Sequence, residues 1–175
     1  MTLLKTLLTL LKTLLFTVLV PGALVVYIPL GLLSSQGDAF HLEVSSPWML
    51  GAIPFLLGVG IYLWCAWQFT FAGRGTPAPI DPPKHLVIRG LYRVVRNPIY
   101  VGVPLALIGE ALLFHELRLA IYAALVFVFF HLWVVLVEEP LLRQKFGASY
   151  QDYCAQVPRW IPHLPIWQRK RSSVN

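Results

Sequence analysis

The stretch NPIYVGVPLALIGEALLFHELRLAIYAALVFVFFHLWVVLVEEP, residues 97–140, contains two apolar runs at about 98–114 and 119–137. A polar turn at 115–118 separates them. A bilayer-spanning helix needs roughly 17 to 25 apolar residues, so the second run is long enough and the first is marginal. Because so short a connection joins antiparallel neighbours, we predict a helical hairpin in a membrane.

Outside this hairpin the chain has two further apolar runs, at about 7–33 and 48–71. The chain is 57% hydrophobic and only 13% charged, with a mean hydropathy of +0.68, which lies outside the range of soluble domains. We therefore predict an all-α, polytopic integral membrane protein with about four transmembrane helices and a C-terminal amphipathic helix. Pro21, Pro29 and Pro54 are expected to interrupt the first two spans. The first run is expected to be a retained span and not a cleaved signal peptide.

We interpret the whole chain, residues 1–175, as one domain. Its expected parts are a first span with an outer loop (1–46), a second span with a cytoplasmic loop (47–97), the hairpin (98–139) and an interfacial tail (140–175), with the amphipathic segment at 140–156.

The distribution of Lys and Arg predicts the orientation in the membrane. The segment 34–46 has neither residue, whereas 72–97 and the C-terminal tail are rich in both. Basic residues favour the cytoplasmic side, so both termini and the segment 72–97 are predicted to be cytoplasmic. The net charge of +6 then suits anionic lipid headgroups, and no nucleic-acid partner is indicated because no basic soluble face is present.

Asn97 and Pro98 are a typical helix start, with Asn as the N-cap and Pro at the first helical position. The free N–H groups of such a start attract anions. Arg89, Arg93 and Arg96 precede it; they are either membrane anchors or part of an anion site.

Glu138 and Glu139 follow the second apolar run, where the second helix of the hairpin is expected to end. A helix C-terminus disfavours carboxylates unless a cation is near. Consecutive helical residues point about 100° apart, so only one of the two is able to pair with Arg143. The hairpin brings this pair beside Asn97. A ligand with an anionic and a cationic group would suit the junction; S-adenosylmethionine is one such zwitterion, and others remain open.

Two sequence blocks resemble the isoprenylcysteine carboxyl methyltransferase and phospholipid methyltransferase superfamily. They are GLYRVVRNPIYVG (90–102) and EEPLLRQKFGASYQDYCAQVPRWIP (138–162), within a likeness that covers roughly 58–163. The resemblance implies an S-adenosylmethionine-dependent methyltransferase whose lipid-linked acceptor arrives from the bilayer. Many members have His where this chain has Asn97. The first 45 residues resemble no family that we can name.

The resemblance and the hairpin register together give the candidate site. The expected catalytic residues are Glu138, Glu139 and Arg96. The expected cofactor-binding residues are Tyr92, Arg96, Asn97, Pro98, Tyr100, Gly102, His131, Glu138 and Glu139. His131 is included because it lies seven residues before Glu138, on the same face of a regular helix. Family likeness adds Arg159 in the tail, and no metal is required.

The acceptor has two candidate chemistries. A carboxylate is favoured because Arg93, Arg96 and Arg143 outnumber the possible bases, Glu138 and His131. A phospholipid amine is the alternative, and it needs a general base because an amine must lose its proton before it attacks. Two other classes of protein remain: a membrane reductase with a related helical core, and a non-catalytic membrane adaptor.

Overall fold

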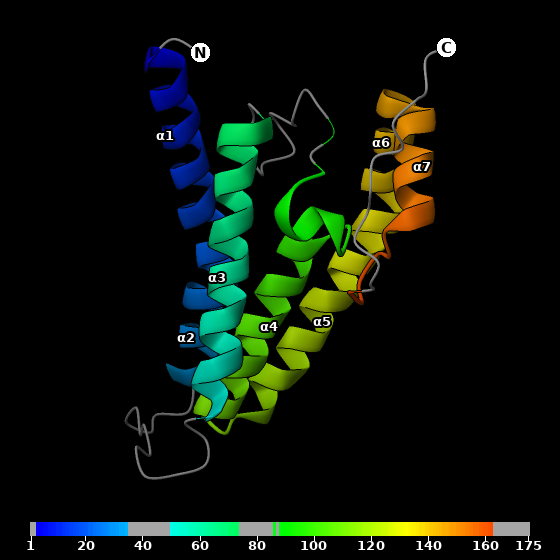
Figure 1. Cartoon of the computed structure of the whole chain (residues 1–175). Helices are drawn as coiled ribbons and strands as arrows, with labels where there is room; N and C mark the ends of the chain where they lie inside the picture. The colour runs from blue at the N-terminus through cyan, green and yellow to red at the C-terminus, as the bar shows by residue number, and fades with distance from the viewer. Residues whose placement is uncertain (1–2, 35–49, 74–85, 87, 163–175) are drawn as a thin grey trace, which may run out of the picture.

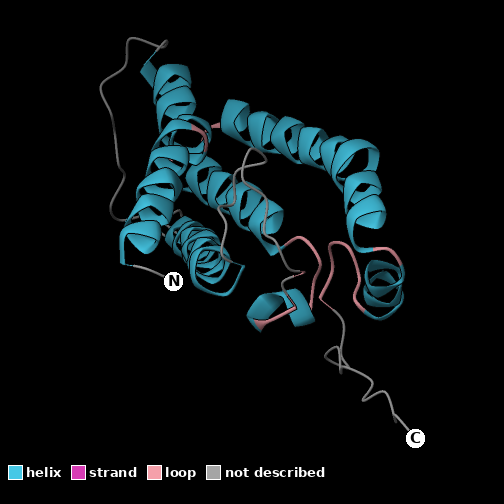
Figure 2. Ribbon diagram, turned by 90° about the horizontal axis from the view of Figure 1, so that it is seen from above, coloured by secondary structure: helices cyan, strands magenta, loops and turns pink. Residues whose placement is uncertain are grey.

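The computed structural model describes residues 3–34, 50–73, 86 and 88–162 (Figure 1). Within these ranges the chain is all-helical and contains no strand (Figure 2). The elements are α1 (Leu3–Leu19), η1 (Ala23–Tyr27), α2 (Ile28–Ser34), α3 (Ala52–Gln68), η3 (Phe69–Gly73), η4 (Gly90–Arg93), α4 (Pro98–Leu113), α5 (Leu117–Trp133), η5 (Val134–Glu138), α6 (Glu139–Phe146) and α7 (Ala148–Gln156). The predicted all-α membrane fold is confirmed. Residues 1–2, 35–49, 74–85, 87 and 163–175 lie outside the described residues.

Three helical segments in the described part of the chain are long and apolar enough to cross a membrane: Leu7–Ser34, Ala52–Phe71 and Leu117–Phe146. The remaining predicted span, at about 98–114, corresponds to the helix α4, which has 16 residues. Its length of about 24 Å is shorter than a hydrocarbon core of about 30 Å. With α4 included, the successive segments α1–α2, α3, α4 and α5 run in alternating directions, and α1 begins at the end of the bundle where α6 and α7 lie (Figure 1). The count of four crossings stays a prediction.

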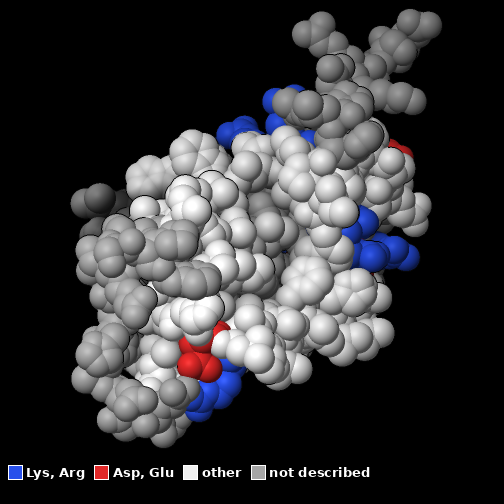
Figure 3. Space-filling model, turned by 90° about the horizontal axis from the view of Figure 1, so that it is seen from below, with Lys and Arg blue, Asp and Glu red and all other residues white. Residues whose placement is uncertain are grey.

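The face seen from below is almost entirely uncharged, and its few charged residues gather in small groups (Figure 3). The turn between α4 and α5 carries an ion pair, Arg118 Nε to Glu116 Oε1 at 3.0 Å. Glu116 also caps α5 by accepting a hydrogen bond from the Arg118 backbone N–H. His115 completes this turn with a φ of 48°. The predicted α4–α5 hairpin is therefore confirmed, and its tight turn aligns the two helices along their length.

Glycines bring α3 and α4 into backbone contact. A Cβ added at Gly58 would collide with the backbone of Gly102 and Ala106, and one added at Gly109 would collide with the backbone of Phe55. Helices in lipid gain little from burying apolar side chains against one another, so close backbone approach supplies the packing contacts. This interface holds the N-terminal end of α4 in a fixed position.

Prolines affect the first two spans differently. Pro21 lies where α1 ends, just before the π-helical segment η1, so the first span is interrupted as predicted. Pro54 lies in the first turn of α3, which continues unbroken to Gln68. The expected interruption at Pro54 is therefore wrong, because first-turn N–H groups have no partner within the helix and a proline costs nothing there.

Each of the three segments long enough to cross a membrane contains a π-helical stretch among the described residues, namely η1, η3 and η5. A π-helical turn accommodates an extra residue and rotates the face that follows it, and such turns are frequent at functional sites. The stretch η5 lies immediately before Glu139, so the direction of the two adjacent carboxylates depends on it.

The predicted amphipathic helix at 140–156 is instead two helices. The helix α6 ends before Gly147, which has a φ of 53°, and α7 begins after it. A left-handed backbone conformation ends a helix and favours glycine. Beyond this break α7 folds back on the chain before α4: Tyr153 donates a hydrogen bond of 2.7 Å to the Tyr92 carbonyl.

Candidate active site

The start of α4 has the predicted capping residues but a different role for Asn97. Asn97 is the N-cap and Pro98 the first helical residue, yet the Asn97 side chain makes no capping hydrogen bond. Its amide Nδ2 instead donates to the Arg159 carbonyl at 3.3 Å. Asn97 therefore joins α4 to the residues that follow α7.

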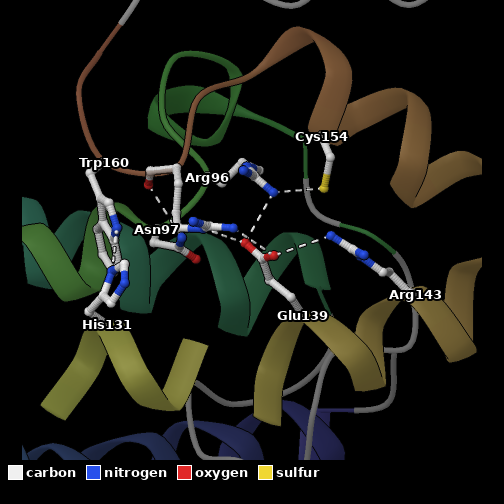
Figure 4. A network of polar contacts seen from close by, with 8 residues as sticks. Arg96, Asn97, His131, Glu139, Arg143, Cys154 and Trp160 are labelled. Atoms are coloured by element: carbon white, nitrogen blue, oxygen red, sulfur yellow. Dashed lines mark hydrogen bonds and ion pairs between the residues drawn. The ribbon is translucent and has the colours of Figure 1, made fainter. Parts of the chain in front are cut away.

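Glu139 is the centre of a buried ion cluster (Figure 4). Its carboxylate accepts hydrogen bonds from Arg159 Nε at 2.7 Å and Nη2 at 3.0 Å, and from Arg96 Nη1 at 3.2 Å. Arg143 Nη2 lies 3.5 Å from Glu139 Oε2, which confirms the expected pairing of one of the two glutamates with Arg143. The residue is only 3% exposed, and charge-assisted bonds of this kind compensate a buried carboxylate. The hydrogen bond to Glu139 raises the pKa of Arg159.

Residues 157–160, here called the C-terminal strap, are tied to the start of α4 and to α5. The Pro158 carbonyl accepts a hydrogen bond from the Arg96 backbone N–H at 2.9 Å. Trp160 Nε1 donates to His131 Nδ1 at 3.1 Å, and its ring packs against Phe127. Together with the Arg159 bonds to Glu139 and Asn97, these contacts fix the strap beside the site (Figure 4).

Glu138 faces away from this cluster. One of its carboxylate oxygens, Oε2, is buried without a hydrogen-bond partner among the described residues. The hydroxyl of Tyr100 lies near the Glu138 carboxylate, and Trp133 lies near Tyr100. Arg96 Nε is likewise buried and without a partner in the described part of the chain. A buried donor and a buried acceptor, both unpaired, are costly unless a ligand or water pairs with them.

Both side chains line one cavity of about 300 Å³. Its polar end is formed by Tyr92, Arg96, Asn97, Tyr100 and Glu138. Its other lining residues are apolar except Tyr62: Phe16, Val20, Pro21, Leu24, Phe69, Ile99, Val103, Phe129, Phe130 and Trp133. The volume lies within the range of small-molecule sites, and such sites combine apolar walls with a few placed polar groups.

The sequence-predicted residues thus separate into two groups. Tyr92, Arg96, Asn97, Tyr100 and Glu138 line the cavity, whereas Pro98, Gly102, His131 and Glu139 do not. Burial raises the pKa of Tyr92 well above its usual value, so its hydroxyl stays neutral. Gly102 lies against the backbone of Gly58 and serves helix packing.

His131 does not line the cavity. Its Nδ1 accepts the hydrogen bond from the Trp160 indole N–H instead. The prediction assumed a regular helix from His131 to Glu138, in which seven residues return almost to the same face. The π-helical stretch η5 intervenes and rotates Glu138 relative to His131. Phe130, the preceding residue, packs against Tyr100 instead, with ring centroids 4.9 Å apart.

Sequence reasoning missed several residues of the site. Trp133 supports Tyr100, and Cys154 Sγ accepts a hydrogen bond from Arg96 Nη1 at 2.8 Å. Trp160, within the predicted interfacial tail, packs against Phe127 and His131 of α5. Phe16 and Leu24 come from the N-terminal region, for which the sequence offered no functional signal.

Comparisons with known proteins agree with this geometry. The family model described as phospholipid methyltransferase matches residues 47–149, more than half of the chain. The protein-S-isoprenylcysteine O-methyltransferase of Schizosaccharomyces pombe is 35% identical over 80 residues, 46% of this chain and 34% of that protein. The protein-S-isoprenylcysteine O-methyltransferase B of Arabidopsis thaliana is 32% identical over 80 residues, 45% of this chain and 40% of that protein.

The matched segments thus span only about a third to two fifths of these relatives. No solved structure matches the chain significantly. The family match covers the α4–α5 hairpin, the adjacent carboxylates and every residue at the polar end of the cavity, so the chain belongs to the phospholipid methyltransferase family.

Proposed function

We propose that this protein is an integral membrane methyltransferase that uses S-adenosylmethionine and acts on a lipophilic acceptor at the cytoplasmic edge of the bilayer. One observation carries the proposal: a single cavity joins an apolar wall to an unpaired buried donor, Arg96 Nε, and an unpaired buried acceptor, Glu138 Oε2. Such a cavity suits a polar zwitterion at one end and a hydrocarbon chain at the other.

The residues at the polar end fit S-adenosylmethionine. Arg96 Nε is a donor for a carboxylate, and the start of α4 adds a positive helix end beside it. Glu138 Oε2 is an acceptor for a ribose hydroxyl and a negative charge for the sulfonium. When bound, S-adenosylmethionine would supply a methyl group from its positively charged sulfur. The rest of the molecule, S-adenosylhomocysteine, would leave as a neutral thioether.

The chain's own contribution is positioning. Glu139 holds the Arg96 and Arg159 side chains in place, so Arg96 keeps a fixed position in the lining of the cavity. Tyr100 and Trp133 lie beside Glu138 in the lining of the cavity and would help to position its carboxylate. Holding two reactants in a near-attack arrangement accounts for a large part of the acceleration of such transfers.

The acceptor group is a carboxylate in the first candidate, as in the isoprenylcysteine O-methyltransferases that two relatives are named for. Arg96 Nε would then donate a hydrogen bond either to the carboxylate of S-adenosylmethionine or to the carboxylate of the acceptor. The second candidate is an amine, as the phospholipid methyltransferase description of the family suggests. The unpaired Glu138 oxygen would suit this second candidate, because a carboxylate is able to accept the proton that an amine must lose.

Ligand binding to the purified full chain tests the proposal. We expect S-adenosylhomocysteine to bind and NADPH not to bind. Glu138→Gln should weaken S-adenosylhomocysteine binding at least about tenfold, in line with the loss of a hydrogen bond to a charged group. Glu116→Gln, in the exposed ion pair of the α4–α5 turn, is the matched control and should bind normally. NADPH binding would support the reductase alternative, and binding of neither ligand would support the adaptor.

A further inference from the structure

We propose that the N-terminal helical segment Phe16–Leu24 is the wall that selects the hydrocarbon chain of the acceptor. The inference rests on the proposed function and assigns a role to a part of the chain outside the family match, which covers 47–149. The occupant is the apolar chain of a membrane lipid or lipid-linked molecule. Its reactive group lies at the polar end of the cavity, beside Glu138 and Arg96.

The segment supplies a quarter of the residues that line the cavity, namely Phe16, Val20, Pro21 and Leu24, and α5 adds Phe129, Phe130 and Trp133. The polar end belongs entirely to the residues matched by the family model. The cavity is therefore built from two parts of the chain, of which only one carries the residues that suit the methyl donor.

The chemistry of the wall decides which ligand it contacts. None of the four N-terminal lining residues has a polar side chain. Adenine, ribose and the amino-acid part of S-adenosylmethionine would lose hydrogen bonds to water against such a wall without replacing them, and each loss is costly. A hydrocarbon chain has no such groups, and it gains from every methylene that it buries.

Two residues that line the cavity are well exposed, Val20 at 44% and Phe129 at 61%. Both belong to helical segments long and apolar enough to cross a membrane, so these side chains face lipid. A chain too long for the cavity is thus able to continue into the bilayer, and side-chain size along Phe16–Leu24 sets how much of it is contained.

Hydroxyl contacts place the wall independently of its apolar side chains. Thr13 Oγ1 and Thr70 Oγ1 are 3.1 Å apart, and Thr17 Oγ1 and the Tyr62 hydroxyl are 2.8 Å apart. The Tyr122 hydroxyl donates to the Leu24 carbonyl at 3.2 Å. Substitutions of Phe16 or Val20 leave all three contacts intact, so they should alter the shape of the wall without detaching the helix.

The test compares acceptors that differ only in chain length, N-acetyl-S-farnesylcysteine and N-acetyl-S-geranylgeranylcysteine, and dimyristoleoyl and dioleoyl phosphatidylethanolamine. Phe16→Ala enlarges the cavity and should raise the long-to-short ratio of kcat/KM by about fivefold or more; Val20→Phe should lower it similarly. Leu15→Ala, on the lipid-facing side of the same helix and 57% exposed, is the control and should leave the ratio unchanged. S-adenosylhomocysteine affinity should stay within about twofold in all three variants.

An unchanged ratio in both Phe16→Ala and Val20→Phe, with S-adenosylhomocysteine still bound, overturns the inference and leaves the proposed function standing. Failure of the unaltered protein to bind S-adenosylhomocysteine overturns the proposed function itself. Photolabelling gives a readout that needs no turnover. An N-acetyl-S-farnesylcysteine analogue with a diazirine at the far end of its chain should label residues 16–24, and labelling confined to other parts of the protein also overturns the inference.

Discussion

Glu138 and Glu139 are consecutive residues with opposite surroundings. Glu139 is bonded to Arg96, Arg143 and Arg159, whereas Glu138 lines the cavity and has a buried carboxylate oxygen without a partner among the described residues. The π-helical stretch η5 ends at Glu138, so the two carboxylates diverge at the point where the helix changes its winding. We therefore expect substitution of Glu139 to lower stability and substitution of Glu138 to weaken ligand binding.

Substitution of the two glutamates by glutamine should separate ligand binding from stability. Glu139→Gln leaves the buried Arg96 without its counter-ion and should lower the free energy of unfolding by about 3 kcal/mol. Glu138→Gln should reduce activity and S-adenosylhomocysteine affinity with little change in thermal stability. Arg143→Ala, whose side chain is mostly exposed, is a control expected to cost about 0 to 1 kcal/mol. Normal turnover in both glutamine variants would be inconsistent with this site.

The pH dependence of turnover should identify the acceptor group. At saturating substrates, a carboxylate acceptor predicts a rate that is nearly flat from about pH 6.5 to 9, because the acceptor is already ionised. An amine acceptor predicts a rise of about tenfold per pH unit while the amine is protonated. We expect the flat profile. The rising profile would reject the carboxylate in favour of a phospholipid amine.

Substitution of His131 should affect the C-terminal strap and not the chemistry. His131→Phe keeps the ring contact with Trp160 but removes the acceptor for its indole N–H. The expected cost is about 1 kcal/mol of stability, with the slope of the pH–rate profile unchanged. Thermal unfolding and pH–rate curves measure the two effects. A lower rate together with a changed shape of the pH–rate profile in this variant would instead assign His131 as the general base.

The contact between α3 and α4 is tested by paired glycine substitutions. Gly58→Ala places a Cβ against the backbone of Gly102 and Ala106, and backbone is unable to move aside cheaply. The expected loss is about 1 to 3 kcal/mol. Gly60→Ala, two residues away with no atom within 4 Å of its added Cβ, should be neutral or slightly stabilising. Equal thermal stability of the two variants would contradict the packing described here.

Membrane orientation is tested by cysteine labelling. Ser34, at the end of α2, and Gln151, in α7, are both exposed. If the two apolar runs of the hairpin both cross the membrane, cysteines at these positions lie on opposite sides, with position 151 cytoplasmic. An impermeant thiol reagent applied to sealed vesicles should therefore label only one of them. Labelling of both from the same side would contradict the four-crossing arrangement.

The sequence alone determined the membrane fold and the junction on which the site is built. Long apolar runs, the short turn at 115–118 and the Asn97–Pro98 start are local signals, because helix length, turns and caps depend on neighbouring residues. Once α4 and α5 are antiparallel, the start of α4 must lie beside Glu138 and Glu139. Arg96 and Glu139, 43 residues apart, are accordingly in contact.

Only the tertiary structure decided which carboxylate faces the cavity and what surrounds it. The direction of the Glu138 side chain depends on the π-helical winding of η5, and no type of residue in this segment predicts a π-helical turn. Arg159 and Trp160 reach the site through the break at Gly147 and the folding back of α7. Phe16 and Leu24 complete the cavity because α1 is held to α3 and η3 by pairs of hydroxyls. These are contacts between distant segments, whose free energies depend on packing and not on the local pattern of residues.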